Sequence, residues 1–306
     1  MKTQYVVKTH QLCKQYGKQY AVDHIDMHIK KGDIYGFIGR NGAGKSTTLK
    51  MIAGLIQPSL GEIELFGDAL TNQISHQRIG ILIEEAGLYP HLNAYDNLEL
   101  QATSLGVVDK QVIENVLKLM NLDHVEKKKV KDFSMGMKQR LGIAMAMLGN
   151  PDFLILDEPT NGLDPEGIRE IRETLLKLNQ EQGMTIIVSS HILGELNKLA
   201  TTFGIIKDGV LIQEISKEEL DQKCKEYLSI EVKDIEKACF VLEEMNENIE
   251  YEVASQNCIH IYQYTDSSHL ISHFVHNEID IISCSFYSQD LEDYFLKLME
   301  GGQTHV

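Results

Sequence analysis

The sequence has 306 residues, of which 43% are hydrophobic, and a net charge of −16 at pH 7. This length and composition are typical of a globular protein with two domains, and no apolar run approaches the ~18 residues of a membrane span. The N-terminus alternates like a strand and lacks the apolar core of a signal peptide. The five cysteines are scattered, without a Cys-x-x-Cys pair, which favours reduced thiols. We therefore expect a soluble, cytoplasmic protein.

The negative charge is concentrated in the C-terminal part of the chain. Residues 225–306 contain 16 acidic and 4 basic residues, a net charge of −12, so that residues 1–224 carry only −4. Such an acidic segment is repelled by nucleic acids and by anionic lipid head groups. We expect no nucleic-acid partner, and any association with a membrane is expected to depend on a partner protein.

Short apolar runs in the first 70 residues predict β-strands, because many of them alternate with a period of two. A helix is then expected directly after a glycine-rich loop. The predicted strands cover residues 5–9, 20–22, 24–29, 33–38 and 62–67, and the helix covers 48–55.

The glycine-rich loop between the buried strand and the helix has the spacing Gly-x-x-x-x-Gly-Lys-Ser. Glycines let successive backbone N–H groups turn toward an anion, and the following helix adds its positive N-terminal end. The lysine would face the outer phosphates of a nucleotide, and the serine hydroxyl would bind Mg²⁺. The predicted nucleotide-binding residues of this loop are Gly39, Arg40, Asn41, Gly42, Ala43, Gly44, Lys45, Ser46 and Thr47.

Strands and helices then alternate, which predicts a parallel sheet with ligands at the carboxyl ends of its strands. The strand over residues 153–159 ends in Asp157 and Glu158, which are placed to hold Mg²⁺ and to activate a water molecule. The other expected elements are strands over 79–83 and 185–191, helices over 94–100, 112–120, 138–148, 166–182 and 192–200, and a hairpin over 204–212.

After Cys224 the pattern changes to the order βαββαβ with a terminal helix, which predicts a small ferredoxin-like α+β domain. We expect domains over 1–222 and 225–306, with a helical subdomain at about 90–150. The expected strands are 227–232, 251–254, 258–263 and 279–287, and the expected helices are 235–247, 267–276 and 291–299.

Three histidines, His269, His273 and His276, share one face of an expected helix. A metal site is one interpretation. A polar helix surface is the interpretation that we favour, because no carboxylate or cysteine is clearly placed with them.

The motifs occur in the order found in the ATP-binding subunits of ABC transporters. Over about residues 4–220 the sequence resembles that family, and in detail it is most similar to subunits of bacitracin-resistance and lantibiotic-immunity exporters. The residues that carry the resemblance are loop 39–47, segments 133–140, 153–158 and 161–164, Glu84, His191 and segment 290–295.

The resemblance implies a P-loop ABC ATPase fold with a RecA-like parallel sheet core, an antiparallel β subdomain and a helical subdomain. It implies ATP and Mg²⁺ as cofactors. It also implies that two copies of the chain form a homodimer, in which the second ATP-binding subunit completes each site. For the nucleotide, the resemblance implies that Tyr16 stacks on the adenine, that Lys45 and the loop amides bind the phosphates, and that Ser46, Asp157 and Glu84 bind Mg²⁺. For catalysis, it implies that Glu158 is the general base and that His191 contacts the γ-phosphate. For the dimer, it implies that Ser134 and Gly136 contact the ATP of the opposite chain and that Asp164 lies at the interface.

The sequence departs from the common pattern of the family at two places. Glu84 stands where a glutamine is usual, and it adds a negative charge near the phosphates. In the signature loop, Met135 and Met137 replace a glycine and the glutamine, whereas Ser134 and Gly136 are kept.

Two functions are compatible with these features. The first is an ATPase that drives a separate membrane permease of an exporter, located at the inner face of the membrane through that permease, with a peptide antibiotic as cargo by resemblance. The second is a soluble ABC ATPase that acts on the ribosome or DNA. The single phosphate loop, the absence of heptads and the acidic C-terminal part favour the first.

Overall fold

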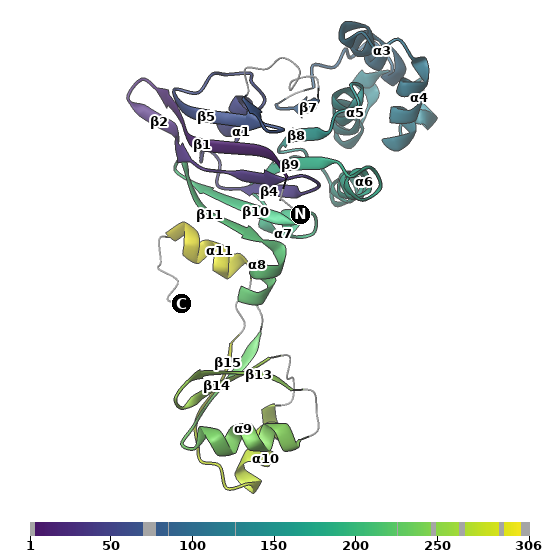
Figure 1. Cartoon of the computed structure of the whole chain (residues 1–306). Coiled ribbons are helices and arrows are strands. Elements are labelled where there is room, and N and C mark those ends of the chain that lie inside the picture. The colour runs from purple at the N-terminus through teal and green to yellow at the C-terminus, as the bar shows by residue number, and fades with distance from the viewer. Residues whose placement is uncertain are drawn as a thin grey trace. The chain divides into compact units, whose positions relative to one another are not determined.

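The computed structural model describes residues 4–69, 78–84, 86–125, 127–224, 226–245, 249–262, 267–287 and 291–300. The chain forms two compact units, Met1–Lys217 and Glu218–Val306, whose elements are labelled in Figure 1.

A six-stranded sheet in the order β11-β10-β4-β9-β8-β7 forms the centre of the first unit. The strands β7, β8, β9, β4 and β10 run parallel, and β11 pairs antiparallel with β10 at the edge. All residues of β4, β8 and β9 are buried, as expected for parallel strands that are covered on both faces. The bounds are β4 (Ile34–Ile38), β7 (Ile79–Leu82), β8 (Phe153–Asp157), β9 (Thr185–Ser190), β10 (Thr202–Lys207) and β11 (Val210–Ser216).

A second, antiparallel sheet packs with helix α1 (Lys45–Ile52) against the parallel sheet. One hydrophobic cluster joins the three layers, with Val7 and Ile25 from the second sheet, Leu49 from α1 and Phe153 from β8. Helix α1, which starts at the glycine-rich loop, therefore packs against both sheets. The strands of the second sheet are β1 (Tyr5–Tyr16), β2 (Gln19–Ile25), β3 (His28–Lys30), β5 (Leu60–Leu65) and β6 (Asp68–Ala69).

The single strand predicted over residues 24–29 is wrong, because β2 ends at Ile25 and β3 begins at His28. The Asp26 carboxylate between them accepts hydrogen bonds from the Gln11 backbone and side chain, both at 2.7 Å. The Met27 N–H donates to the Thr9 hydroxyl at 2.8 Å. The Asp26 carboxylate and the Met27 N–H thus bond outside the backbone ladder, while the Met27 carbonyl oxygen still accepts the Thr9 N–H at 3.0 Å. A side chain far away in sequence thus interrupts a clean alternation.

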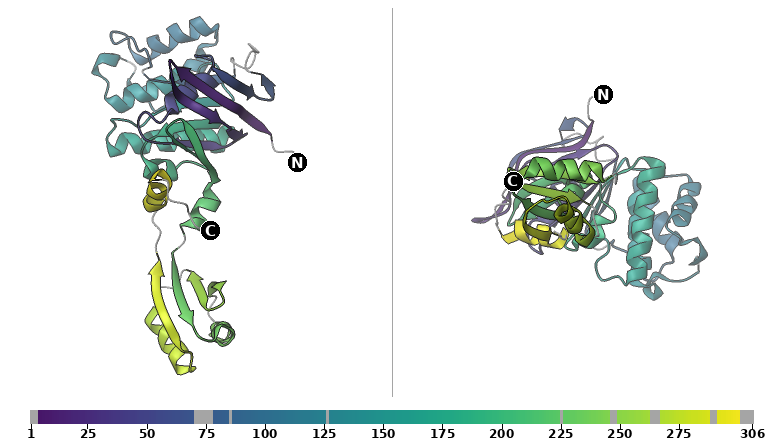
Figure 2. Two further views of the ribbon diagram at one scale, coloured as in Figure 1. Left: turned by 90° about the vertical axis from the view of Figure 1, so that its left-hand side faces the viewer. Right: turned by 90° about the horizontal axis from the view of Figure 1, so that it is seen from below.

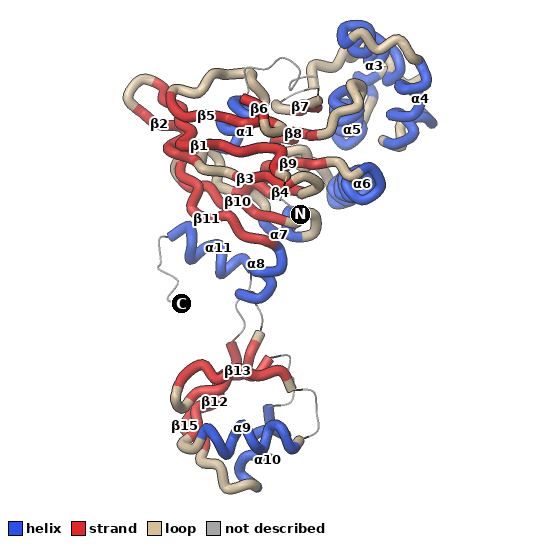
Figure 3. Tube along the Cα trace, in the orientation of Figure 1, coloured by secondary structure: helices blue, strands red, loops and turns tan. Residues whose placement is uncertain are grey.

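Helices complete the first unit (Figure 3). The helices α3, α4 and α5 pack against one another, while α6 contacts β9 and the short α7 contacts β4 and β9. The bounds are α3 (Ala94–Leu105), α4 (Lys110–Leu119), α5 (Met135–Met147), α6 (Pro165–Gln182) and α7 (Leu193–Asn197), with 3₁₀ turns at Asp123–Val125 and Val130–Asp132.

The second unit contains an antiparallel sheet in the order β13-β14-β12-β15. The helices α9 and α10 pack on one face of it (Figure 2), where Ile230, Ile259, Val241 and Phe274 meet in a separate core. A helix at 217–223 was not predicted. The bounds are α8 (Lys217–Lys223), β12 (Tyr227–Val232), α9 (Ile235–Glu244), β13 (Glu250–Ser255), β14 (Cys258–Tyr262), α10 (Ser267–His276), β15 (Ile281–Tyr287) and α11 (Leu291–Glu300).

The Tyr35 side chain of β4 lies over Gly204 of β10 and reaches Glu214 of β11. Burial raises the pKa of Tyr35 well above its usual value, so the phenol keeps its proton and donates to Glu214 at 2.8 Å. A Cβ on Gly204 would collide with this hydroxyl.

We expect Gly204→Ala to destabilise the first unit by about 1–3 kcal/mol, because overpacking moves a buried side chain. The midpoint of urea unfolding, followed by circular dichroism, measures this loss. Gly194→Ala is the matched control, since nothing lies within 4 Å of a Cβ there. Equal midpoints for the two variants would show that Tyr35 is not held in place.

Candidate functional site

The predicted site residues gather at the carboxyl edge of the parallel sheet. The glycine-rich loop follows β4, Asp157 ends β8 and Glu158 follows it, His191 follows β9, and Glu84 lies two residues after β7. Because these four strands are parallel, their carboxyl ends meet at one edge (Figure 1).

The loop over residues 39–47 has a backbone that only glycine fits at several points. Gly42 and Gly44 have φ angles of 82° and 109°, a region that side chains strongly disfavour. A Cβ on Gly44 would lie 2.5 Å from the Ala21 carbonyl oxygen, and one on Gly39 would lie 2.5 Å from that of Ile206. The loop is thus packed backbone against backbone, with Gly44 as the N-cap of α1.

The Lys45 ammonium lies at the centre of the site. Its side chain is only 5% exposed, and it donates to the carbonyl oxygens of Gly39 at 2.8 Å and Arg40 at 3.3 Å. It also pairs with Glu158 Oε1 at 3.1 Å, while Glu158 Oε2 lies 2.7 Å from His191 Nδ1. The structure therefore brings together the three residues that were predicted to be catalytic. Glu158 adopts a φ of 48°, an uncommon conformation that often marks functional positions.

Ser189 fixes the two acidic residues at the end of β8, a function that sequence reasoning missed. Its hydroxyl donates to Asp157 Oδ1 at 2.5 Å and accepts the Glu158 N–H at 2.9 Å. Asp157 and Ser189 are both buried. The only signal in the sequence was a serine at the end of a buried strand, and the pairing of β8 with β9 is needed to place it.

Three other predicted nucleotide or Mg²⁺ contacts, Ser46, Glu84 and Tyr16, are more exposed than Lys45. Ser46 is half-buried on α1. Glu84 is paired with Lys50 at 2.5 Å rather than with Ser46 or Asp157. Tyr16 is 55% exposed at the end of β1, with the Lys14 ammonium 5.4 Å from its ring centre. An exposed ring is available for a planar ligand.

Three further predicted residues lie at the starts of two helices. Ser134 is the N-cap of α5, accepting the Met137 N–H at 3.2 Å, and Asp164 is the N-cap of α6, accepting the Gly167 N–H at 3.0 Å. A Cβ on Gly136 would lie 3.7 Å from the Gly167 Cα. The three residues thus belong to the two neighbouring helix starts and form a second patch.

Arg140 anchors the helix that follows Ser134, and it too was missed as an individual residue. It is buried, donates to the carbonyl oxygens of Met120 at 3.0 Å and Asn121 at 3.3 Å, and pairs with Glu170 at 3.3 Å. One guanidinium therefore joins α5 to the end of α4 and to α6.

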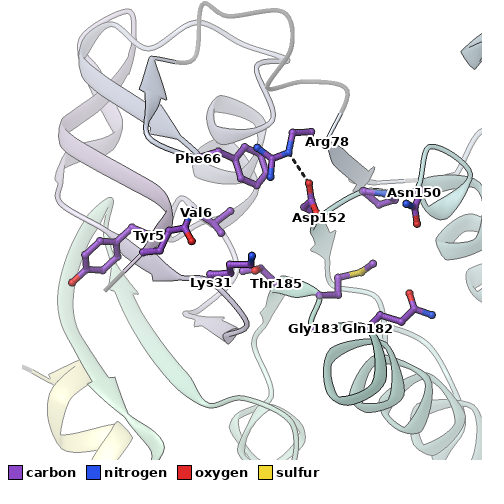
Figure 4. A pocket seen from close by; sticks show the side chains of 13 residues that line it. Tyr5, Val6, Lys31, Phe66, Arg78, Asn150, Asp152, Gln182, Gly183 and Thr185 are labelled. Atoms are coloured by element: carbon purple, nitrogen blue, oxygen red, sulfur yellow. Dashed lines mark hydrogen bonds and ion pairs between the residues drawn. The ribbon is translucent and has the colours of Figure 1, made fainter. Parts of the chain in front are cut away.

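A pocket of about 380 Å³ opens at the opposite, amino edge of the sheet, and Figure 4 shows its side chains. Arg78 stacks on Phe66 at 3.8 Å from the ring centre and pairs with Asp152 at 2.6 Å. Its guanidinium is thus engaged within the protein. Ligands of parallel sheets bind at the carboxyl edge, so the pocket is not our candidate site.

Two further predictions from the sequence concern membrane-spanning segments and the three histidines of α10. None of the described helices is long and apolar enough to cross a membrane. On α10, His269 and His276 are exposed and His273 is half-buried, on the side away from the buried Leu270 and Phe274. The rings of His269 and His273 lie 5.8 Å apart.

Comparison with known proteins identifies the family. The profile of the ABC transporter family matches residues 22–161. The bacitracin transport ATP-binding protein BcrA of Bacillus licheniformis is 44% identical over 97% of this chain and 98% of its own length, and BcrA of Enterococcus faecalis is 42% identical over 98% of both. The chain belongs to the ABC transporter family, as an ATP-binding subunit. The lantibiotic transport ATP-binding protein SrtF of Streptococcus pyogenes is 45% identical over 68% of this chain and 90% of its own.

Solved structures confirm the ABC ATPase fold. The cassette MJ0796, in a dimeric post-hydrolysis state bound to ADP and Pi, superposes with a TM-score of 0.63 at 28% identity over 69% of this chain and 98% of its own. The cbiO1 protein of Clostridium perfringens, part of the ABC transporter complex cbiONQ, gives 0.65 at 28% identity, over 72% and 92%. The protein is therefore an ATPase of a family that binds ATP, and the ribosome or DNA alternative is not favoured.

We expect Ser189→Ala to slow ATP hydrolysis roughly tenfold, because small displacements of a reacting group are costly. Asp157 and the Glu158 N–H would both lose the same buried partner. Steady-state phosphate release measures the effect. Thr174→Ala, which removes a hydroxyl bonded only to the Glu170 carbonyl oxygen within α6, is the control. Wild-type turnover in Ser189→Ala would contradict the assignment.

Proposed function

We propose that this ATPase drives a membrane-spanning permease, encoded on a separate chain, that exports a peptide antibiotic of the bacitracin or lantibiotic type. Alignment with BcrA over nearly the full length of both chains is the observation that carries the proposal. We further propose that the protein lies at the inner face of the cell membrane, held there by the permease. The proposed contact surface is residues 85–100 and the following helices; residue 85 lies outside the described residues.

The phosphate site is proposed to consist of the loop amides of residues 39–47 and Lys45. The backbone supports this, because Gly42 and Gly44 have positive φ angles and nothing lies within 4 Å of a Cβ position on Gly42. Glu158 lies 3.1 Å from Lys45 and supplies the negative charge that a phosphate would otherwise provide. An arriving phosphate would replace Glu158 beside Lys45. Glu158 would then be free to accept a proton from water, while His191 stays within hydrogen-bonding distance.

We propose that Ser46, Asp157 and Glu84 hold Mg²⁺. Hydroxyl and carboxylate oxygens are the ligands that Mg²⁺ prefers, and the buried Asp157 carboxylate is oriented by Ser189. Bound Mg²⁺ would neutralise charge on the phosphates. Tyr16 is proposed to stack on the adenine, as its exposed ring permits.

The active unit is proposed to be a homodimer in which each ATP is enclosed by two chains. Ser134, Gly136 and Asp164 lie together on the starts of α5 and α6. This second patch is proposed to contact nucleotide on the opposite chain. The dimeric MJ0796 cassette supports the arrangement. ATP would then close the dimer and hydrolysis would release it, which converts chemistry into motion.

The two parts of the chain are proposed to be domains over 1–222 and 225–306. We interpret the second as ferredoxin-like, on the basis of its βαββαβ order and the strand order β13-β14-β12-β15. The BcrA alignments extend over 97% and 98% of this chain and so include this domain. We infer that the domain serves the exporters of this subfamily.

We expect Glu158→Gln to lower ATP hydrolysis about a hundredfold or more, because a general base contributes at least this much. ATP binding should persist, so that the variant accumulates as a closed dimer, measured by light scattering after size-exclusion chromatography with ATP and Mg²⁺. Lys45→Ala is the control and should lose ATP binding itself. A Glu158→Gln variant that turns over at the wild-type rate would rule out this base.

The permease is expected to copurify with the tagged Glu158→Gln chain from detergent-solubilised cells in the presence of ATP. The trapped state should hold the complex together, and mass spectrometry identifies the partner. A stoichiometric protein with several membrane spans supports the exporter function. Ribosomal or DNA-bound partners, without a membrane protein, would refute it and leave only the ATPase activity.

A further inference from the structure

A salt bridge outside the phosphate loop joins helix α1 to the segment that follows strand β7. Lys50 Nζ of α1 lies 2.5 Å from Oε1 of Glu84, at the end of β7. Glu84 is 69% exposed along its side chain and Lys50 is 29% exposed, so neither group is forced into the contact by burial. Glu84 also has a φ of 64°, an unfavourable conformation for a residue other than glycine.

Lys50 lies beside the proposed Mg²⁺ ligands. It follows Ser46 by four residues on the same helix, and so shares its face. The pKa of Lys50 is raised, chiefly by its hydrogen bond to Glu84, with a smaller electrostatic contribution from Asp157. One ammonium thus neutralises carboxylates that belong to the same proposed metal site.

We propose that Lys50 is a positioning residue for Glu84: it holds this carboxylate until Mg²⁺ and nucleotide arrive, and Mg²⁺ then replaces Lys50 as the cation bound to Glu84. The inference rests on the proposed role of Glu84 as a metal ligand. A neutral glutamine at this position needs no counter-ion, whereas a carboxylate near the phosphates does. Lys50 thereby offsets the charge that Glu84 adds.

Competition between Lys50 and Mg²⁺ predicts the sign of the effect. An exposed ion pair contributes up to about 1 kcal/mol. Lys50→Met should therefore tighten the binding of a divalent cation in the presence of nucleotide by about threefold to fivefold. Lys50→Arg keeps the positive charge and should stay near the wild-type affinity.

The test is a titration of the full chain with Mn²⁺ at a saturating concentration of a non-hydrolysable ATP analogue, with free Mn²⁺ measured by electron paramagnetic resonance. This readout does not depend on turnover. Lys110→Met is the matched control, because Lys110 pairs with Glu99 at 3.1 Å on the helical region away from this site, and it should not change the affinity. In a Glu84→Gln background, most of the gain from Lys50→Met should disappear.

Unchanged or weaker Mn²⁺ binding in Lys50→Met would overturn the proposal, as would an undiminished gain in the Glu84→Gln background. Failure of the proposed function looks different. In that case the wild-type chain itself would bind no Mn²⁺ with the nucleotide, or Asp157→Asn would leave the affinity unchanged.

Discussion

The need to stabilise a buried ammonium organises the candidate site. The Lys45 side chain is 5% exposed, and burying an unpaired charge in a protein interior is very unfavourable. Two loop carbonyl oxygens and Glu158 meet this requirement. The Lys45 ammonium therefore contacts both the glycine-rich loop and Glu158 after β8. Glu158 in turn contacts His191. Anything that binds there must offer an anion at least as good as Glu158.

The same constraint explains why the sheet must be parallel and fully buried at this point. Lys45 follows β4, Glu158 follows β8 and His191 follows β9, and β9 lies between the other two strands. Only a parallel arrangement delivers all three groups to one edge. Ser189 of the middle strand then bonds both acidic residues of β8. The core shared by α1 and both sheets keeps the loop from moving away from these strands.

Much of this arrangement could be predicted from the sequence, because it depends on short-range patterns. The glycine spacing before Lys45 and the apolar run before Asp157 each specify a strand with a functional end. What could not be predicted depends on partners distant in sequence. Asp26 interrupts a regular strand because Gln11 captures its carboxylate. The only local signal for Ser189 is its place at the end of a buried strand, and Lys50 shows none. Their partners Asp157 and Glu84 lie about 30 residues away and meet them only through the fold.

The departures from the family pattern differ in their physical consequences. Glu84 adds a charge, and that charge is met within the chain by Lys50. The methionines of the signature loop add no charge, and the Met135 side chain is 56% exposed. If two chains close over ATP, this surface becomes covered, and the burial favours closure at about 25 cal/mol per Å² of apolar area. The first departure therefore acts on the metal end of the site, and the second acts on the interface between chains, so their effects on turnover should be separable and close to additive.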